Sequence, residues 1–173
     1  MAEGFQKDEY VVYGKVGVCR VVDHCEMTFG GENGEYYVLS PQSDPRSSLY
    51  VPCRNETLMA RLRPLMTPRE IDDLLDGVGE EPLPWPEEKN ERSRLFRAAA
   101  AGDRFLLVRL IRCLYERKQE RIAIGKRLAS ADETMLVECV RLLEEELSIS
   151  LGLPRSRVPA YVTEHMEKTV VTE

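Results

Sequence analysis

The chain has 173 residues, of which 43% are hydrophobic and 31% are charged, and its formal net charge at pH 7 is −6. This length holds one large domain or two small ones, and the composition is that of a globular chain rather than a disordered one. No apolar run approaches the roughly 18 residues that a membrane-spanning helix needs, and the first residues do not have the pattern of a signal peptide, so we expect a cytoplasmic protein.

The positive charge is concentrated in one segment. Residues 89–127 carry twelve Lys or Arg and four Asp or Glu, a local balance of +8, whereas residues 1–88 carry eight basic and seventeen acidic residues. Because salt screens charges beyond about 8–10 Å, a polyanion close to this segment responds to it more than to the total charge. A basic helix is most often a solvated face, but an asymmetry this steep favours nucleic-acid binding.

The cysteines favour reduced thiols. They are odd in number and have no C-x-x-C spacing, and they are Cys19, Cys25, Cys53, Cys113 and Cys139. His24 lies beside Cys25 in the sequence, with Cys19 and Cys53 nearby, which suggests a metal site. However, neighbouring residues of a strand point to opposite faces of a sheet, so these two side chains should not converge. We therefore expect no metal and no cofactor.

Short strands are predicted in the first 60 residues. Segments rich in Val and Tyr, separated by turn residues, are YVVY (10–13), VGVCRVVDHC (16–25), EYYVL (35–39) and SSLYV (47–51). Gly30 and Gly31 lie where a hairpin needs positive φ angles. Four or five antiparallel strands in this length favour a small, strongly bent sheet or a partly open barrel. Such a sheet leaves an edge for a partner strand.

Helices are predicted after residue 66. Thr67-Pro68-Arg69-Glu70 has the spacing of a capping box with proline at the first helical position. EEPLPWPEE (80–88) follows as a linker, and a helix is expected over about 88–101. Asp103 is placed to cap the next helix. On these two helices, the arginines at 94, 97, 109 and 112 lie opposite the apolar stripes, so they should face outward.

Two more helices complete the expected bundle. Asp132 is placed to cap a long helix that ends at Gly152, and a short helix is expected over about 159–168. The fold class is therefore α+β, with a small antiparallel β barrel followed by an all-α bundle. The domains are predicted as residues 1–65, a short helix and linker over 66–88, and a helical domain over 89–173.

Catalytic motifs are absent from the sequence. We find no Walker loop, dinucleotide fingerprint, H-E-x-x-H or G-x-S-x-G pattern. The two histidines, His24 and His165, lie in opposite halves of the chain, and the acidic run at 144–146 diverges around a helix. We therefore expect a protein that is not an enzyme.

The order of these pieces resembles the CarD/CdnL family of bacterial transcription regulators. The resemblance covers residues 11–152 and rests on VVYGKVGVCRV, EYYVL and YVPCRN with LRP in the strand half. It continues with a tryptophan after the linker, then GD, a helix ending LYERKQER, GK, and a helix ending EEEL. Each piece alone is weak, whereas their order and spacing together are more specific.

The resemblance implies a Tudor-like or SH3-like N-terminal module that binds the β subunit of bacterial RNA polymerase, as in the transcription-repair coupling factor. It also implies a helical domain that contacts promoter DNA upstream of the −10 element, and we predict that the isolated protein binds DNA weakly and with little sequence preference. In the family, a tryptophan wedges into the minor groove at the upstream edge of the melted bubble, and Trp85 occupies that position. Met27 and Tyr50 align near basic residues that bind polymerase in some relatives, which makes them candidate partner contacts.

The candidate DNA contacts follow from the resemblance and from the charge pattern. They are Trp85, Lys89, Arg92, Arg94, Arg97, Lys126 and Arg127. Trp85 lies between two prolines, which restrict the backbone and limit the entropy lost on insertion.

Two alternatives remain at this point. Trp85 could instead cap the bundle by packing on Leu95 or Phe96. The protein could be an adaptor that binds only proteins, with no direct DNA contact. We expect a monomer that does not bind membranes.

Overall fold

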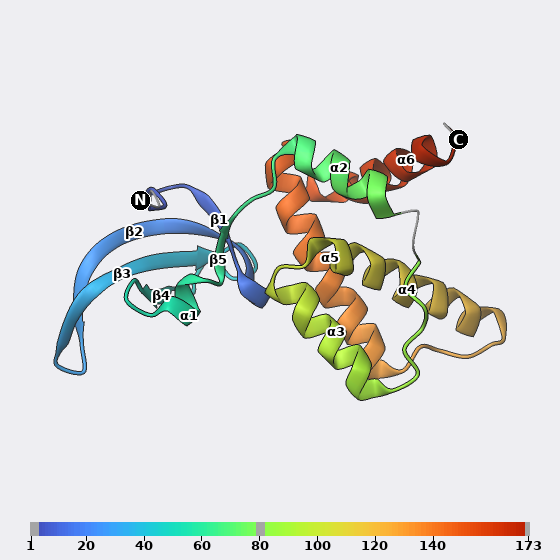
Figure 1. Ribbon diagram of the computed structural model, residues 1–173, viewed down its shortest axis with the longest axis horizontal. Helices are drawn as coiled ribbons and strands as arrows, with labels where there is room; N and C mark the ends of the chain where they lie inside the picture. Colours follow the sequence, from blue (N-terminus) through green and yellow to red (C-terminus); the bar gives the residue numbers. More distant parts are fainter. Residues whose placement is uncertain (1–3, 79–81, 172–173) are drawn as a thin grey trace. The chain divides into compact units, whose positions relative to one another are not determined.

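The computed structural model describes residues 4–78 and 82–171. The chain divides into two compact units, Met1–Leu65 and Met66–Glu173, and Figure 1 shows strands in the first and helices in the second. Helix α2 and the described linker residues 82–88 therefore belong to the second unit. Residues 80 and 81 of the expected linker lie outside the described residues.

The first unit contains one antiparallel sheet with the strand order β4-β3-β2-β1-β5. A 3-10 turn, Gly14–Val16, joins the first two strands, and the helical turn α1, Glu56–Met59, precedes the last strand. The strands are β1 Tyr10–Tyr13, β2 Gly17–Phe29, β3 Glu32–Pro41, β4 Leu49–Pro52 and β5 Leu62–Pro64.

The expected barrel is not closed. Among the described strands, β4 pairs only with β3 and β5 pairs only with β1, so both are edges of an open sheet. The long strands β2 and β3 curve strongly (Figure 1), and their register shifts between Val21 and Asp23. A bulge of this kind increases the local twist, so the sheet bends without closing.

The hairpin between β2 and β3 extends further than the sequence indicated. Gly30 and Gly31 make its turn with φ angles of 59° and 84°, which glycine adopts without a steric penalty. The ladder continues up to the pair Phe29 and Glu32, beyond the strand ends expected at Cys25 and Glu35.

The core of the first unit lies on one face of the sheet. Alternate residues of the strands meet there, and the buried members are Val11, Cys19, Val21, Tyr37, Leu39, Val51 and Leu62. Leu58 and Met59 of α1 pack against this cluster. The helical turn therefore covers apolar strand residues that an open sheet of this size would otherwise expose.

The second unit is a helical bundle around its own apolar core. Helix α4 packs against α2, α3 and α5, and α6 packs against α2 and α5. Within the described residues, no helix combines the length and apolar character needed to cross a membrane. The helices are α2 Pro68–Val78, α3 Lys89–Ala101, α4 Arg104–Ala123, α5 Ser130–Leu151 and α6 Val158–Val171, with a 3-10 turn at Arg155–Arg157.

The helix caps match the sequence at two positions and differ at one. The Thr67 and Glu70 side chains each accept a hydrogen bond from the other's backbone N–H, as a capping box requires. Asp103 accepts from the N–H of Leu106 at 2.9 Å. The cap predicted at Asp132 is wrong, because α5 already begins at Ser130 and Asp132 lies buried inside its first turn. A contact with an arginine of another helix accounts for that position.

Candidate functional site

Trp85 lies in the segment 82–88, which forms no helix or strand and leads into α3. Its side chain is half-buried and packs against the apolar core of the helical unit. Two guanidinium groups lie over the indole ring, that of Arg92 at 4.7 Å and that of Arg117 at 5.1 Å from its centroid. The ring is therefore held by core packing and by two nearby cations, and it is neither fully exposed nor sealed in the core.

Arg92 fixes the linker that carries Trp85. Its Nε donates to Oδ1 of Asp132 at 2.8 Å, and its Nη1 donates to the backbone oxygens of Pro86 at 2.8 Å and Glu87 at 3.1 Å. The exposed fractions of the Arg92 and Asp132 side chains are 11% and 4%. This buried ion pair joins the first turns of α3 and α5 and holds the linker backbone against them.

The sequence led us to expect that Arg92 contacts phosphate, but the structure turns its guanidinium group into the protein. Its donors point to a carboxylate and two carbonyls of the protein, and burial removes it from the surface. We leave it out of the candidate DNA-binding surface and assign it a positioning role. This role was not visible in the sequence, because it depends on a partner 40 residues away.

The other five predicted cations are at the surface. Within residues 4–78 and 82–171, none of them forms an ion pair, and all are exposed: Lys89, Arg94, Arg97, Lys126 and Arg127. Lys126 and Arg127 lie in the loop that leads into α5, whose first turn is joined to that of α3 by the Arg92–Asp132 pair. We call these five residues the cationic set.

Other cations of the basic segment are neutralised by the protein itself. Arg104 forms a bidentate ion pair with the buried Glu146, with distances of 3.0 and 2.8 Å. Arg112 and Lys118 are also paired, with Glu116 at 3.2 Å and Glu133 at 2.7 Å. The effective positive charge near 89–127 is therefore smaller than the sequence suggests, and the exposed cationic set supplies part of what remains.

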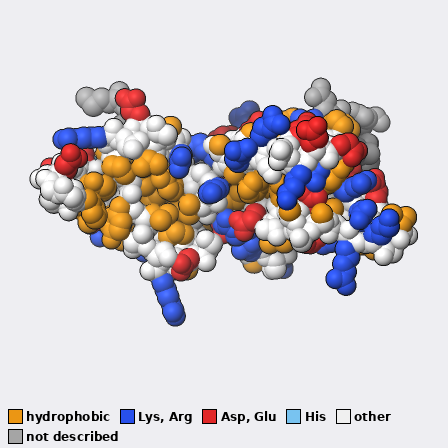
Figure 2. Space-filling view, turned by 90° about the horizontal axis from the view of Figure 1, so that it is seen from below, with side chains coloured by type: hydrophobic (Ala, Val, Ile, Leu, Met, Phe, Trp, Pro, Cys, Tyr) orange, Lys and Arg blue, Asp and Glu red, His pale blue; other side chains and the backbone are white. Residues whose placement is uncertain are grey.

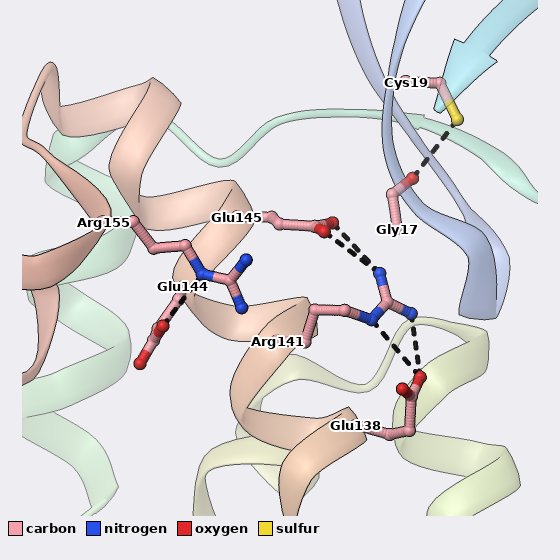
Figure 3. A network of polar contacts seen from close by, with 7 residues as sticks. All are labelled: Gly17, Cys19, Glu138, Arg141, Glu144, Glu145 and Arg155. Atoms are coloured by element: carbon pink, nitrogen blue, oxygen red, sulfur yellow. Dashed lines mark hydrogen bonds and ion pairs between the residues drawn. The ribbon is translucent and has the colours of Figure 1, made fainter. Parts of the chain in front are cut away.

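Helix α5 also pairs its charges internally. Figure 3 shows Arg141 between two carboxylates of its own helix, with Glu138 at 2.9 Å and Glu145 at 3.1 Å. Burial alone would lower the pKa of Arg141, but the bonds with Glu138 and Glu145 outweigh it and raise that pKa. Nearby, Glu144 pairs with Arg155 at 3.0 Å. This acidic stretch therefore supports the bundle and offers no pair of free carboxylates for acid–base chemistry.

The first unit carries an exposed aromatic face on the side of the sheet opposite its core. The Phe29 ring lies 5.1 Å from Tyr36 and 5.5 Å from Tyr50, both with edge-on geometry. Phe29 and Tyr50 are 45% and 46% exposed. Strand alternation places Met27 on the same side as Phe29. We call Met27, Phe29, Tyr36 and Tyr50 the aromatic face.

The two predicted partner residues, Met27 and Tyr50, are thus brought together on one surface by strands β2, β3 and β4. Phe29 and Tyr36 were missed, although apolar residues at positions 25, 27 and 29 alternate as they do in a strand. Figure 2 shows hydrophobic side chains gathered over the first unit, and Lys and Arg mixed with Asp and Glu over the second. Exposed apolar clusters of this kind commonly mark interaction sites.

The family of the first unit is shown by comparison with known proteins. A family model described as the CarD-like/TRCF RID domain matches residues 5–65. The first unit is thus similar to CarD-like/TRCF RID domains, and we call residues 5–65 the RID domain. A search of curated proteins found no match.

The RID domain interacts with RNA polymerase, so the match supports a transcription-related role for this chain. The matched segment contains all five strands of the sheet and ends at Leu65, the last residue of the first unit. The aromatic face and both predicted partner residues lie inside the RID domain. Trp85 and the cationic set lie outside it, in the helical unit.

Proposed function

We propose that this protein is a bacterial transcription regulator that binds the β subunit of RNA polymerase through its RID domain. Its helical unit contacts promoter DNA and stabilises the open complex. The observation that carries the proposal is the RID match over residues 5–65 together with the exposed aromatic face inside it. The proposed action is binding in the cytoplasm as a monomer, with no catalytic step.

The aromatic face is our candidate for the polymerase contact. Interfaces are enriched in Tyr, Phe and Met, and a few aromatic side chains commonly supply most of the binding energy. Phe29 and Tyr50 have rings that are already ordered by contact with each other. Ordering before binding reduces the entropy lost when the partner arrives.

The cationic set is our candidate for the DNA backbone contact. Its side chains are exposed, and none is paired within the described part of the chain, so each can approach a phosphate without first breaking an ion pair. The first unit would hold this weak surface at high effective concentration near the promoter. Sequence preference is not expected, because phosphate contacts carry no base information.

Trp85 is our candidate for the contact with melted DNA. The Arg92 network and core packing hold its ring in place, so part of the cost of ordering an aromatic wedge has been met before binding. At an already opened junction the bases are unstacked, and a base stacked on an aromatic side chain contributes about 1–3 kcal/mol. Such a contact favours open DNA over closed duplex.

An adaptor that binds only proteins is the second candidate. It is favoured by the half-buried position of Trp85 and by the internal pairing of Arg92. In that function, the cationic set would bind an acidic protein surface. The two candidates differ in the effect of Trp85 on promoter opening, since only the first requires it.

Polymerase binding can be tested with the full-length chain. We expect it to capture purified bacterial RNA polymerase, and Phe29→Ser and Tyr50→Ser each to weaken capture by at least about fivefold, as for loss of a typical interface aromatic. Tyr115→Ser is the matched control, because Tyr115 is a 56% exposed aromatic of the helical unit. Absence of capture by the unmodified protein, or equal losses in all three variants, would overturn the proposal.

A further inference from the structure

A second cluster of side chains lies in the first unit and is not part of the aromatic face. His24, Glu35 and Cys53 direct one atom each toward a common point, and these three atoms all lie within 4.8 Å of one another. Nε2 of His24 is 3.6 Å from Oε2 of Glu35 and 3.7 Å from Sγ of Cys53. We call these three residues the His–Glu–Cys cluster.

Three different segments of the chain build this cluster. His24 is on β2, Glu35 is on β3, and Cys53 follows the last residue of β4. The His24 ring stacks on the buried Tyr37 ring at 4.3 Å, with an angle of 18° between the planes. The backbone N–H of Cys53 donates to the backbone oxygen of Glu35 at 3.0 Å. The stacking orients the His24 ring, and the backbone hydrogen bond holds the Glu35 and Cys53 backbones next to each other.

The two separations from His24 match those of a tetrahedral zinc site. With Zn–N and Zn–O bonds of about 2.0–2.2 Å and a Zn–S bond of about 2.3 Å, tetrahedral angles place nitrogen about 3.4 Å from oxygen and about 3.6 Å from sulfur. The observed 3.6 and 3.7 Å differ from these by only a few tenths of an ångström. The third separation, between the Glu35 oxygen and the Cys53 sulfur, lies within 4.8 Å.

We propose that the His–Glu–Cys cluster binds Zn²⁺, with water at the fourth position. A thiolate and an imidazole favour a borderline-soft divalent ion over Mg²⁺ or Ca²⁺, which prefer oxygen ligands. On binding, the ion replaces the proton of the Cys53 thiol, and that proton passes to solvent. This inference is independent of the proposed function, because it uses no residue of the aromatic face or of the cationic set, and not Trp85.

The sequence offers Cys19, Cys25 and Cys53 near His24 but cannot select among them. The most obvious pair in the sequence is His24 with Cys25, but strand alternation sends these two side chains to opposite faces of the sheet. In the ladder His24 pairs with Tyr37, which is part of the core, and Cys25 pairs with Tyr36 of the aromatic face. The thiol that meets His24 is instead Cys53, 29 residues further along the chain. Metal binding here would join β2, β3 and the end of β4, and so stabilise the open edge of the sheet.

Cobalt provides a direct test, since a cobalt–thiolate bond absorbs strongly in the near ultraviolet. We expect untagged, reduced, EDTA-stripped full-length protein to show this charge-transfer band on titration with Co²⁺, and Zn²⁺ to displace it. Cys53→Ser should abolish the band, whereas Cys25→Ser should retain it. Absence of the band in the unmodified protein, or its survival in Cys53→Ser, would overturn the proposal.

Variants of the other two ligands keep the proposal testable if Cys53→Ser does not fold. Loss of a group that only orients a ligand typically weakens metal binding 10–100-fold, so loss of a direct ligand should weaken it by at least about tenfold. His24→Asn and Glu35→Gln should therefore each raise the zinc dissociation constant by about that factor or more, with circular dichroism unchanged. Unaltered zinc affinity in both folded variants would contradict the site.

Discussion

Arg92 joins three segments of the helical unit through a single guanidinium group. It connects α3, the linker backbone at Pro86, and Asp132 at the start of α5, and its plane also lies over Trp85. Burying a charged pair is costly unless its geometry is good and its other hydrogen bonds are satisfied. Both conditions hold here, so the pair specifies where the linker and its indole sit.

Removing Arg92 should therefore destabilise the helical unit strongly. We expect Arg92→Ala to lower the free energy of unfolding by about 3–5 kcal/mol, because Asp132 would be left as an unpaired buried charge. Arg94→Ala is the control on the same helix, and since Arg94 is exposed its effect should stay within about 0.5 kcal/mol. Urea denaturation followed by circular dichroism measures both, and equal effects would contradict the positioning role.

The candidate site was only partly predictable at this scale. Arg94 and Arg97 could be placed at the surface because helical periodicity separates them from the apolar stripe of α3. The same periodicity cannot show that Arg92 turns inward, because that depends on a carboxylate supplied by α5. Asp132 was misread as a cap for the same reason: a short polar residue near a helix start has two uses, and tertiary contacts decide between them.

Helix starts could be predicted where the capping residues are close together in the sequence. The capping box at Thr67 and the cap at Asp103 involve residues within three positions of each other, and both were predicted. The far end of the β2–β3 hairpin was not, because cross-strand pairing and the tight turn at Gly30 stabilise it more than its composition does. The sheet's failure to close also depends on pairings between distant strands.

The hydrogen bond between α2 and α6 should be lost at strongly alkaline pH. The Tyr161 hydroxyl donates to Oδ1 of Asp72 at 2.5 Å, and this hydrogen bond, with a smaller effect of burial, raises the pKa of Tyr161 to about 12. A pKa raised in the folded state favours the protonated phenol. Its stabilising contribution is therefore complete below about pH 10, the ordinary pKa of tyrosine, and is lost as the pH rises toward 12.

We accordingly expect Tyr161→Phe to lower the free energy of unfolding by about 1 kcal/mol at pH 7. The effect should be modest because the Asp72 side chain is 44% exposed and solvent screens the interaction. The difference from the unmodified protein should shrink as the pH rises from 10 toward 12. Tyr115→Phe, on the exposed surface of α4, should have no comparable effect. Denaturation curves at pH 7 and at pH 11 test this, and a difference that does not depend on pH would contradict it.

The whole molecule combines an RID domain with a helical unit whose free positive charge is limited to a few residues. A net charge of −6 makes unaided binding to DNA weak, so the proposed function relies on tethering by polymerase. The fold class could be predicted from the sequence because strands and helices are segregated along the chain. The paired and unpaired cations could not be distinguished, because the acids that neutralise Arg104 and Lys118 come from α5.

Salt dependence tests the cationic set. If three to five phosphates are contacted, log K for duplex DNA should fall with log salt with a slope of about −3 to −4.5. Replacing Lys126 and Arg127 with Gln should reduce the magnitude of the slope by about 1–2. Arg157→Gln is the charge control, since Arg157 is an exposed cation outside the basic segment. A slope unchanged by the double substitution would exclude this loop as a phosphate contact.

The lifetime of the promoter open complex, measured with bacterial RNA polymerase and the full-length protein, tests the central claim most directly. Trp85→Ala should shorten the lifetime that the protein confers by about 5- to 150-fold, corresponding to the loss of about 1–3 kcal/mol of stacking. Leu83→Ala is the matched control, because Leu83 is a half-buried residue of the same linker packed on the same core. The account predicts that only Trp85→Ala shortens the lifetime, whereas equal lifetimes for the two variants would contradict it.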